Sequence, residues 1–265
     1  MRTLLTLLLS ISLSSTALAG NSVYLEQIGT STDTTVNIDI DGNNNSINLS
    51  MEGTGNELDF KQEGNNNTIS WVSYWGSGKA WGGDIDGNNN TLKFEQYNTT
   101  GSDSNKIGFH MLGNSNELHV CQGATFSSST DTTCSGTTPN SEYGGHTVNL
   151  DVHANGNSIK VGQETGTGNA DHYAQIYYYG GDNNDTFLTQ KGNANKTLNM
   201  IIRTDGGEQE LMQKGDGAHT ATIDLTGSYH TDMSMTQQGN TAQSYSLTQN
   251  CQTSGGCSVS VTQGN

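Results

Sequence analysis

The sequence predicts an all-β protein, a two-sided parallel β-solenoid of about 8–9 coils with cross-β stacking and insertions in its turns. Three observations lead to this fold class. Apolar and polar residues alternate over short segments, runs of glycine and asparagine separate those segments, and a glutamine recurs at one place in every second segment. Only 31% of the 265 residues are hydrophobic, which suits a solenoid because each coil has a thin interior.

The stretch Glu57–Trp71 shows the repeating unit most clearly. Leu58, Phe60 and Gln62 alternate with polar residues, a turn containing Gly64 and three asparagines follows, and alternation then resumes. Period-2 alternation places one set of side chains on each face of a strand, and glycine and asparagine tolerate the positive φ of tight turns. We expect the two strands to face each other across the interior of a coil and to pair with the equivalent strands of neighbouring coils.

Segments of two kinds alternate along the chain, with a period of about 22–26 residues. In one kind the inward face is apolar throughout, and in the other it ends in glutamine. Stacked amides satisfy each other's donors and acceptors and fix the register, so we expect an interior amide ladder. The phase is blurred at the start, where Gln27 is followed by Val36–Ile40 and Ile47–Met51, which lack the glutamine. The expected ladder residues are Gln62, Gln96, Gln122, Gln163, Gln190, Gln213, Gln237 and Gln263.

Residues 1–19 have the features of a secretory signal peptide. Arg2 precedes the apolar run Leu4–Leu13, and Ala17–Ala19 fits the cleavage rule. A membrane anchor is the alternative, although the apolar run is too short to span a bilayer. We therefore expect one exported domain, residues 20–265, without membrane insertion. The net charge of −16 for the whole chain disfavours nucleic acids and anionic membranes as partners.

Four cysteines lie in this domain, and export permits them to form disulfides. Sequence proximity favours Cys121–Cys134 and Cys251–Cys257, one of three possible connectivities. A zinc site is the alternative, but the chain lacks Cys-x-x-Cys pairs with nearby histidines. Insertions at turns are expected around residues 75–83, 97–104, 123–145 and 250–257.

No residue pattern indicates an enzyme, a metal site or a cofactor. The segments Asp41–Asn45 and Asp86–Asn90 resemble the start of a calcium loop but lack its later glycine and glutamate, so turn chemistry explains them. Paired carboxylates such as Asp59 and Glu63 are interpreted as outward charges, and no nucleophile elbow or phosphate loop is present. The histidines share no spacing, and we expect them to face solvent: His110, His119, His146, His153, His172, His219 and His230.

Two binding roles are also weighed. An ice-binding solenoid would carry flat outward ladders of threonine, whereas the expected outward positions include charges such as Asp39, Lys61 and Glu95. Such charges oppose sideways association between sheets. An aromatic group could bind sugars or dyes, or could equally pack as loop residues: Trp75, Trp81, Tyr177, Tyr178 and Tyr179.

The spacing Gln62-x-Gly64-x-x-Asn67, followed by Ile69, resembles the repeat of the curlin family, the subunits of bacterial curli fibres. The resemblance implies export through a dedicated outer-membrane pore and nucleated assembly into extracellular amyloid fibres that serve biofilm formation and adhesion. The pattern recurs once in full and twice by its first half: Gln190, Gly192, Asn195 and Thr197; Gln213 with Gly215; Gln237 with Gly239. Ala218 and Ala242 replace the asparagine in the two partial matches.

We therefore expect a structural subunit that polymerises end to end into a fibre on the bacterial surface, reached through the periplasm. A strand follows the expected cleavage site and the sequence ends within a repeat, so two open sheet edges could template each other. The expected partners are further copies, a nucleator subunit and a secretion pore. The expected assembly residues are the glutamines above with Asn67 and Asn195, and the expected turn glycines are Gly64, Gly192, Gly215 and Gly239. The alternative is a monomeric or cell-surface β-solenoid adhesin that binds glycans.

Overall fold

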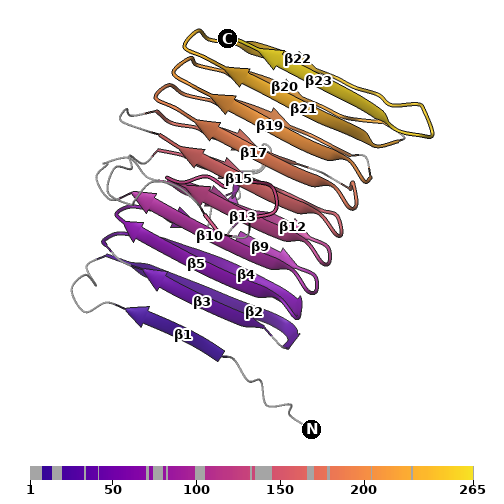
Figure 1. Ribbon diagram of the computed structural model, residues 1–265. Helices are drawn as coiled ribbons and strands as arrows, with labels where there is room; N and C mark the ends of the chain where they lie inside the picture. The colour runs from indigo at the N-terminus through magenta and orange to yellow at the C-terminus, as the bar shows by residue number, and fades with distance from the viewer. Residues whose placement is uncertain are drawn as a thin grey trace.

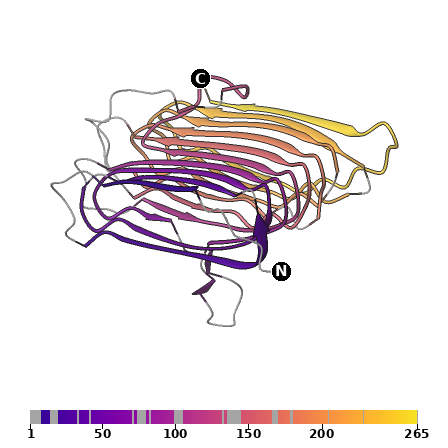
Figure 2. The same cartoon turned by 90° about the horizontal axis from the view of Figure 1, so that it is seen from below.

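The computed structural model describes residues 8–13, 20–32, 34–40, 42–69, 72–73, 80–81, 83–98, 105–131, 133–134, 145–165, 170–177, 180–203, 205–227 and 229–264. Within these ranges the chain forms strands and turns and no helix. Two parallel sheets wind as stacked, flattened coils, and the chain rises from one end of the stack to the other (Figures 1 and 2). The predicted all-β solenoid is therefore confirmed. None of the described residues lies in a helix that could cross a membrane.

Sheet A contains every segment that ends in one of the eight expected ladder glutamines. It has ten strands, which pair in chain order. They are β1 (Leu8–Leu13), β3 (Thr35–Ile40), β5 (Glu57–Gly64), β10 (Thr91–Asn98), β13 (Glu117–Gln122), β15 (Ser158–Glu164), β17 (Asp185–Lys191), β19 (Glu208–Lys214), β21 (Thr231–Gln238) and β23 (Cys257–Gln263).

Sheet B forms the opposite wall of the coils and has eleven strands, in the order β12-β9-β4-β6-β11-β14-β16-β18-β20-β22, with β2 paired to β4. A separate antiparallel pair, β7 (Val72–Ser73) and β8 (Ala80–Trp81), lies outside both sheets. The strands of sheet B are β2 (Ser22–Thr32), β4 (Ser46–Thr54), β6 (Thr68–Ile69), β9 (Gly83–Asp86), β11 (Lys106–Gly108), β12 (His110–Leu112), β14 (Thr147–Asn149), β16 (Tyr173–Gln175), β18 (Thr197–Met200), β20 (Thr220–Ile223) and β22 (Ser244–Leu247).

Within the two sheets, strands that follow each other in the chain do not pair with each other, as expected. β5 pairs with β3 and β10, and β6 pairs with β4 and β11, always in parallel. The register also explains the blurred start of the repeat. Gln27 belongs to β2 in sheet B, opposite Met51, while Ile40 occupies the position of the glutamines in sheet A.

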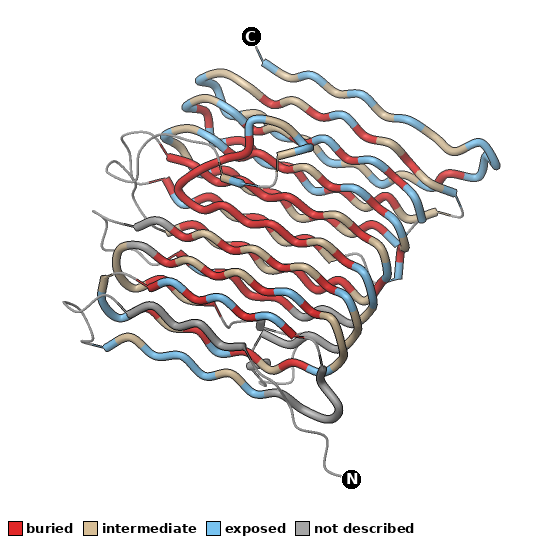
Figure 3. The backbone as a smooth tube through the Cα atoms, turned by 60° about the horizontal axis from the view of Figure 1, so that its bottom comes forward, coloured by how far each residue is buried: buried red, intermediate tan, exposed pale blue. Residues whose placement is uncertain are grey.

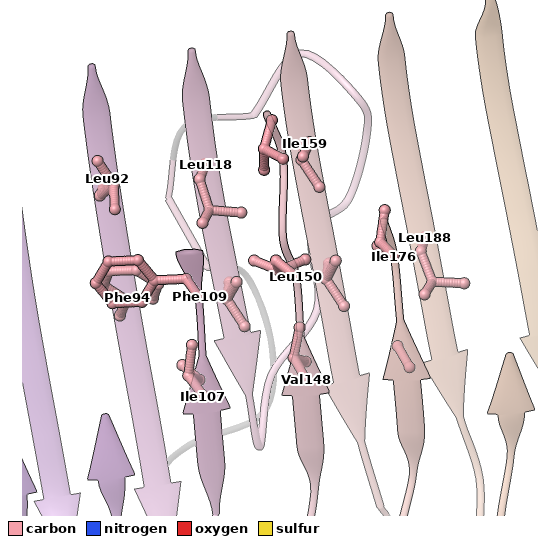
Figure 4. Packing of buried hydrophobic residues seen from close by; sticks show 14 of the residues in the cluster. Leu92, Phe94, Ile107, Phe109, Leu118, Val148, Leu150, Ile159, Ile176 and Leu188 are labelled. Carbon is pink, nitrogen blue, oxygen red and sulfur yellow. The ribbon is translucent and has the colours of Figure 1, made fainter. Parts of the chain in front are cut away.

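The core follows from the alternation in each strand. In β3, Val36, Ile38 and Ile40 are buried while the residues between them are exposed. Figure 3 shows this alternation of buried and more exposed residues along many of the strands. Side chains from both sheets meet along the axis of the stack, as the labelled cluster shows (Figure 4). Phe94 stacks on Phe60 with ring centroids 5.6 Å apart and on Phe109 at 5.3 Å. These rings make the early coils the bulkiest part of the core.

The insertion that begins at Gly123 folds back over the outer face of sheet A. Phe126 covers His119 and contacts Phe187, and Lys160 Nζ donates to the Ser129 carbonyl at 2.7 Å. A Cβ at Gly162 would lie 2.8 Å from Thr125 Cα, so glycine is required where the insertion touches the sheet.

Two disulfides fix the turn excursions, in the pairing that sequence proximity favours. Cys121 bonds Cys134 and ties the insertion to β13, and Cys251 bonds Cys257 where the last turn meets β23. A further expected insertion, 97–104, begins later than expected. Tyr97 and Asn98 extend β10 because they continue its pairing with β5, and residues 99–104 lie outside the described ranges.

The expected insertion at 75–83 falls largely outside the described residues; of it, β8 and the first residue of β9 are described. The expected signal peptide overlaps β1, which pairs with β3 in sheet A. Its cleavage stays a prediction.

The turns bring neighbouring coils into close contact at stacked glycines. Gly192 has φ +133°, and a Cβ there would lie 2.0 Å from the Gly215 carbonyl oxygen of the next coil. A side chain at this position is excluded twice, by the backbone conformation and by the adjacent backbone. The spacing between coils, and not the turn alone, therefore requires glycine here.

We expect Gly192→Ala to lower the free energy of unfolding by about 2–4 kcal/mol, because strain and a backbone clash add. Gly255→Ala is the matched control, since a Cβ at Gly255 meets no atom within 4 Å. Urea denaturation of the soluble chain measures both. Equal stabilities of the two variants would contradict the close contact between coils.

Candidate self-assembly ladders

A continuous amide ladder runs through the interior from Gln122 to Gln263. Each Nε2 donates to the Oε1 of the glutamine in the next coil, at 2.7 to 3.0 Å. The six glutamines are Gln122, Gln163, Gln190, Gln213, Gln237 and Gln263, all opposite one another in sheet A. The expected ladder is present over these six coils.

The same amides also join the two sheets. Gln190 Nε2 donates to the Tyr173 carbonyl at 2.9 Å, and Gln213 Nε2 donates to the Thr197 carbonyl at 3.0 Å, each at the start of a strand of sheet B. Both N–H groups of an interior amide are thus used, one along the axis and one across the coil. The glutamine therefore fixes the position of one sheet relative to the other along the stacking axis.

The ladder does not extend to the first two predicted glutamines, which corrects our expectation. Both amide atoms of Gln62 and the Oε1 of Gln96 are buried without a hydrogen-bond partner. Gln96 Nε2 makes only a long bond, 3.4 Å, to the Thr68 carbonyl. These two amides lie in the same strands as Phe60 and Phe94, where the core is bulkiest.

A second ladder, of asparagines, lies at the corner that precedes sheet A. Each asparagine is buried, and its Oδ1 accepts the backbone N–H of the equivalent residue in the next coil at 2.8 to 3.0 Å. In Asn56, Asn90 and Asn116 the Nδ2 also donates to a backbone carbonyl in the turn of the next coil. The members are Asn56, Asn90, Asn116, Asn157 and Asn184. Motif spacing alone does not single them out, although each one closes a turn directly before a strand.

The opposite corner, before sheet B, starts with asparagines and continues with histidines. Asn67 N–H donates to Asn45 Oδ1 at 2.9 Å, as expected for a ladder. Further along, His172 N–H donates to His146 Nδ1, Lys196 N–H to His172 Nδ1, and Gln243 N–H to His219 Nδ1, at 3.2 to 3.3 Å. A histidine Nδ1 thus takes the role of an asparagine Oδ1.

The other ring nitrogen, Nε2, bonds a backbone carbonyl, as the side-chain Nδ2 of an asparagine does. The Nε2–H of His172 donates to the Glu164 carbonyl at 3.0 Å, and that of His219 donates to the Lys214 carbonyl at 2.9 Å. Only the neutral ring with its proton on Nε2 can make both bonds, because Nδ1 must remain an acceptor. The hydrogen bonds therefore assign the tautomer.

Burial keeps these rings neutral. It lowers the pKa of His172 to about 4, and it holds the pKa of His146 well below 6.5, where the neighbouring His172 adds to the effect. The pKa of His219 is also lowered, mainly by burial. The rings of His146 and His172 stack with centroids 4.9 Å apart. The corner thus holds several groups whose protonated forms would be buried side by side.

Lys196 is the largest polar side chain in this corner and is fully buried. Its Nζ donates to the carbonyls of Ala194, Gly215 and Gly217 at 2.7 to 2.8 Å, so all three donors of the ammonium are used. Burial lowers its pKa to about 8. Lys196 therefore bonds turn carbonyls of its own coil and of the next coil, at a corner where asparagine bonds turn carbonyls in other coils.

A one-residue change in turn length explains why Asn195 is not in the interior. Gln62 and Asn67 are five positions apart. Lys196 is the structural equivalent of Asn67 in its own coil, and it lies six positions after Gln190. The extra residue turns Asn195 outward, where its Oδ1 accepts the Asp171 N–H at 3.0 Å. Its predicted place in the interior ladder is wrong. For the same reason His219 and Gln243, and not Ala218 and Ala242, are the interior residues.

The expectation of solvent-facing histidines is wrong for most of those described. His119, His146, His172 and His219 are buried, because the insertion covers the first and the corner encloses the others. His153 and His230 are partly exposed, and the side chain of His110 lies outside the described set.

The asparagine turns behave as turns. Asn44 and Asn89 adopt φ near 57°, and among the described residues no group of three or more acidic, histidine or cysteine side chains could hold a metal ion. Of the aromatic group, Tyr177 is partly buried, only the backbone of Trp81 is described, and the others fall outside the described ranges.

The fold and these ladders define the class of the protein: a disulfide-containing β-solenoid repeat protein with polar ladders inside its coils. No family model matches the chain, no curated protein is similar to it, and no solved structure matches it.

Proposed function

We propose that the protein is the structural subunit of an extracellular curli-like amyloid fibre, which assembles end to end. The observation that carries this proposal is the uninterrupted parallel, in-register pairing along sheet A, with a glutamine ladder at its centre. Stacks of this kind in amyloid differ only in that each strand comes from another chain. The resemblance of Gln62–Ile69 to the curlin repeat supports the same function.

The exposed strands at one end of the stack support it further. β22 and β23 are edge strands of sheets B and A, and their inward residues Tyr245, Leu247 and Val261 are only partly buried. Gln237 donates to both the Thr220 carbonyl and Gln263, whereas Gln263 donates to the Ser244 carbonyl alone. A donor is left for one more coil. Paired strands of another copy would cover this edge.

The other end of the stack has a complementary apolar edge. β3 carries Val36, Ile38 and Ile40, and removal of residues 1–19 would uncover it from β1. Ile40 stands at the ladder position, so a head-to-tail junction would interrupt the amide ladder once per subunit. Backbone pairing and apolar contacts would hold that junction. A head-to-tail contact that does not close into a ring forms a filament.

The secretion pore, the nucleator, transit through the periplasm and the biofilm role follow from the curlin resemblance and are part of this proposal. The carboxylates on the outer face of sheet A fit a fibre that resists uncontrolled sideways growth.

The purified protein is expected to form fibres with cross-β reflections at about 4.8 and 10 Å, growing faster when seeded with preformed fibres. Fibre diffraction and seeded kinetics measure this outcome. A protein that stays monomeric at high concentration, and whose monomer binds glycans, would contradict the fibre and support a β-solenoid adhesin instead.

A further inference from the structure

The two outer faces of the solenoid differ in charge. The outward residues that begin each strand form two columns along each sheet. In sheet A these columns contain nine charged side chains: Glu57, Asp59, Lys93, Glu117, Lys160, Asp185, Glu208, Glu210 and Asp232. In sheet B, Lys106 is the only charged residue among the described members of the equivalent columns. In these two columns the expected mixture of charges is present on sheet A and absent from the described residues of sheet B, whose outward charges lie further along the strands, as at Glu26 and Glu52.

Beyond Lys106 the columns of sheet B are uncharged over five successive coils. We call these ten residues the neutral strip; the last four are exposed, and the first six are partly exposed. Its side chains bond within the strip, as in the bond from Thr220 Oγ1 to Ser244 Oγ at 3.1 Å. The strip consists of Thr147, Asn149, Tyr173, Gln175, Thr197, Asn199, Thr220, Thr222, Ser244 and Ser246.

We propose that the neutral strip is a lateral docking surface for a second copy of this chain, so that two stacks pair through their sheet B faces. Charge is the first reason. A chain of net charge −16 repels its copies, and the carboxylates of sheet A place part of that charge on the opposite face. The strip is a surface on which two copies can approach without placing like charges against each other.

Periodicity selects a second copy over other neutral partners. Rows of hydroxyl and amide groups repeat at the spacing of the coils, about 4.8 Å, so a partner that matches every row must itself carry β-strands at that spacing, as a second copy does. Like columns of asparagine and threonine can interdigitate across paired sheets, as in steric zippers. Asp151 and Asp224 flank the strip, and Asp151 is already paired with His153. The contact is thus limited to the two neutral columns.

The size of the strip determines when pairing occurs. Ten side chains, each occupying about 4.8 Å across the strands and about 7 Å along them, cover roughly 340 Å² per copy, well below the ~800 Å² per partner of a stable complex. Single copies should not pair. Stacked copies present many strips on one rigid face, so lateral binding becomes strong only after fibre growth. This inference rests on the proposed fibre.

The test compares two double variants that add the same charge. Thr220→Glu with Ser246→Glu places two carboxylates on the neutral strip, in adjacent coils. Ser260→Glu with Thr236→Glu places two on sheet A, diagonally in two adjacent coils. Both pairs of sites lie on the outside of the last coils, so effects on folding should be similar. Fibre width is measured by electron microscopy, with cross-β diffraction as the check on fibre formation.

We expect wild type and the sheet A variant to form paired fibres, and the strip variant to form single fibres of about half the width. Unpaired wild-type fibres, or a strip variant that pairs like wild type, would overturn the docking surface but leave the fibre intact. Pairing of wild type only after a neutral polysaccharide is added would assign the strip to a glycan and overturn it as well. Absence of any fibre would refute the proposed function and this inference together.

Discussion

Replacing Gln190 and Gln213 together with leucine is expected to lower the free energy of unfolding by about 4 kcal/mol or more and to slow fibre assembly. The substitution leaves the Gln163 donor and the Gln237 acceptor buried without partners, together with two strand carbonyls of sheet B. Each buried polar group left unpaired costs about 1–3 kcal/mol, partly offset by the apolar gain. Urea denaturation of the soluble chain and seeded kinetics measure the two effects.

Gln62→Leu is the matched control, and the expected effect has the opposite sign. Both amide atoms of Gln62 are buried and unpaired, so leucine removes a buried polar group without breaking a hydrogen bond. We expect a variant that is as stable as wild type or more stable, by about 1 kcal/mol. If Gln62→Leu destabilised as much as the double variant, the distinction between paired and unpaired glutamines would be wrong.

Lowering the pH from about 6.5 to 4 is expected to destabilise the protein through its buried histidines. The pKa of His172 is about 4 in the folded chain and about 6.5 when unfolded, so between these values the unfolded chain binds the extra proton. The stability contribution is present above pH 6.5 and is lost as the pH falls toward 4. For His172 alone the loss is about 3 kcal/mol, and His146 acts in the same direction.

The structural reason is that protonation of Nδ1 removes the acceptor for the N–H of the next coil, beside Lys196 and the other rings. The variant His172→Asn tests this directly, because asparagine fills the equivalent place at Asn67. We expect its unfolding free energy to depend less steeply on pH between 6.5 and 4. Titration of surface carboxylates contributes to both proteins, so the difference between them isolates the histidine. Parallel pH profiles would rule out His172 as a source.

The fold could be predicted because the information is local and repeated. Alternation in Leu58, Phe60 and Gln62 identifies a strand and its inward face, and the glycine-asparagine turns set the coil length. The recurrence of glutamine then requires parallel stacking, since only stacking brings those amides together. Both disulfides followed from sequence proximity and from the positions of the insertions.

The corner ladders could not be predicted by motif spacing. Turns of five and six residues place different motif positions in the interior, so Asn195 faces outward and Lys196 inward. A buried histidine also looks like a surface residue in sequence. It fits the interior because its Nδ1 accepts a backbone N–H of the next coil, and the sequence alone does not show that contact. The alternation of the strand places His119 outward correctly, but it gives no sign of Phe126 above it.

The insertion over sheet A gives the molecule a landmark on the outer face of that sheet. Its described residues, between Cys121 and Cys134, cover the outer face near β13, β15 and β17. In a filament of stacked copies this bulge would recur once per chain, always reaching from β13 toward β17 and so pointing to the same end. Image averaging could then find subunit boundaries and filament polarity, which the 4.8 Å rise alone hides.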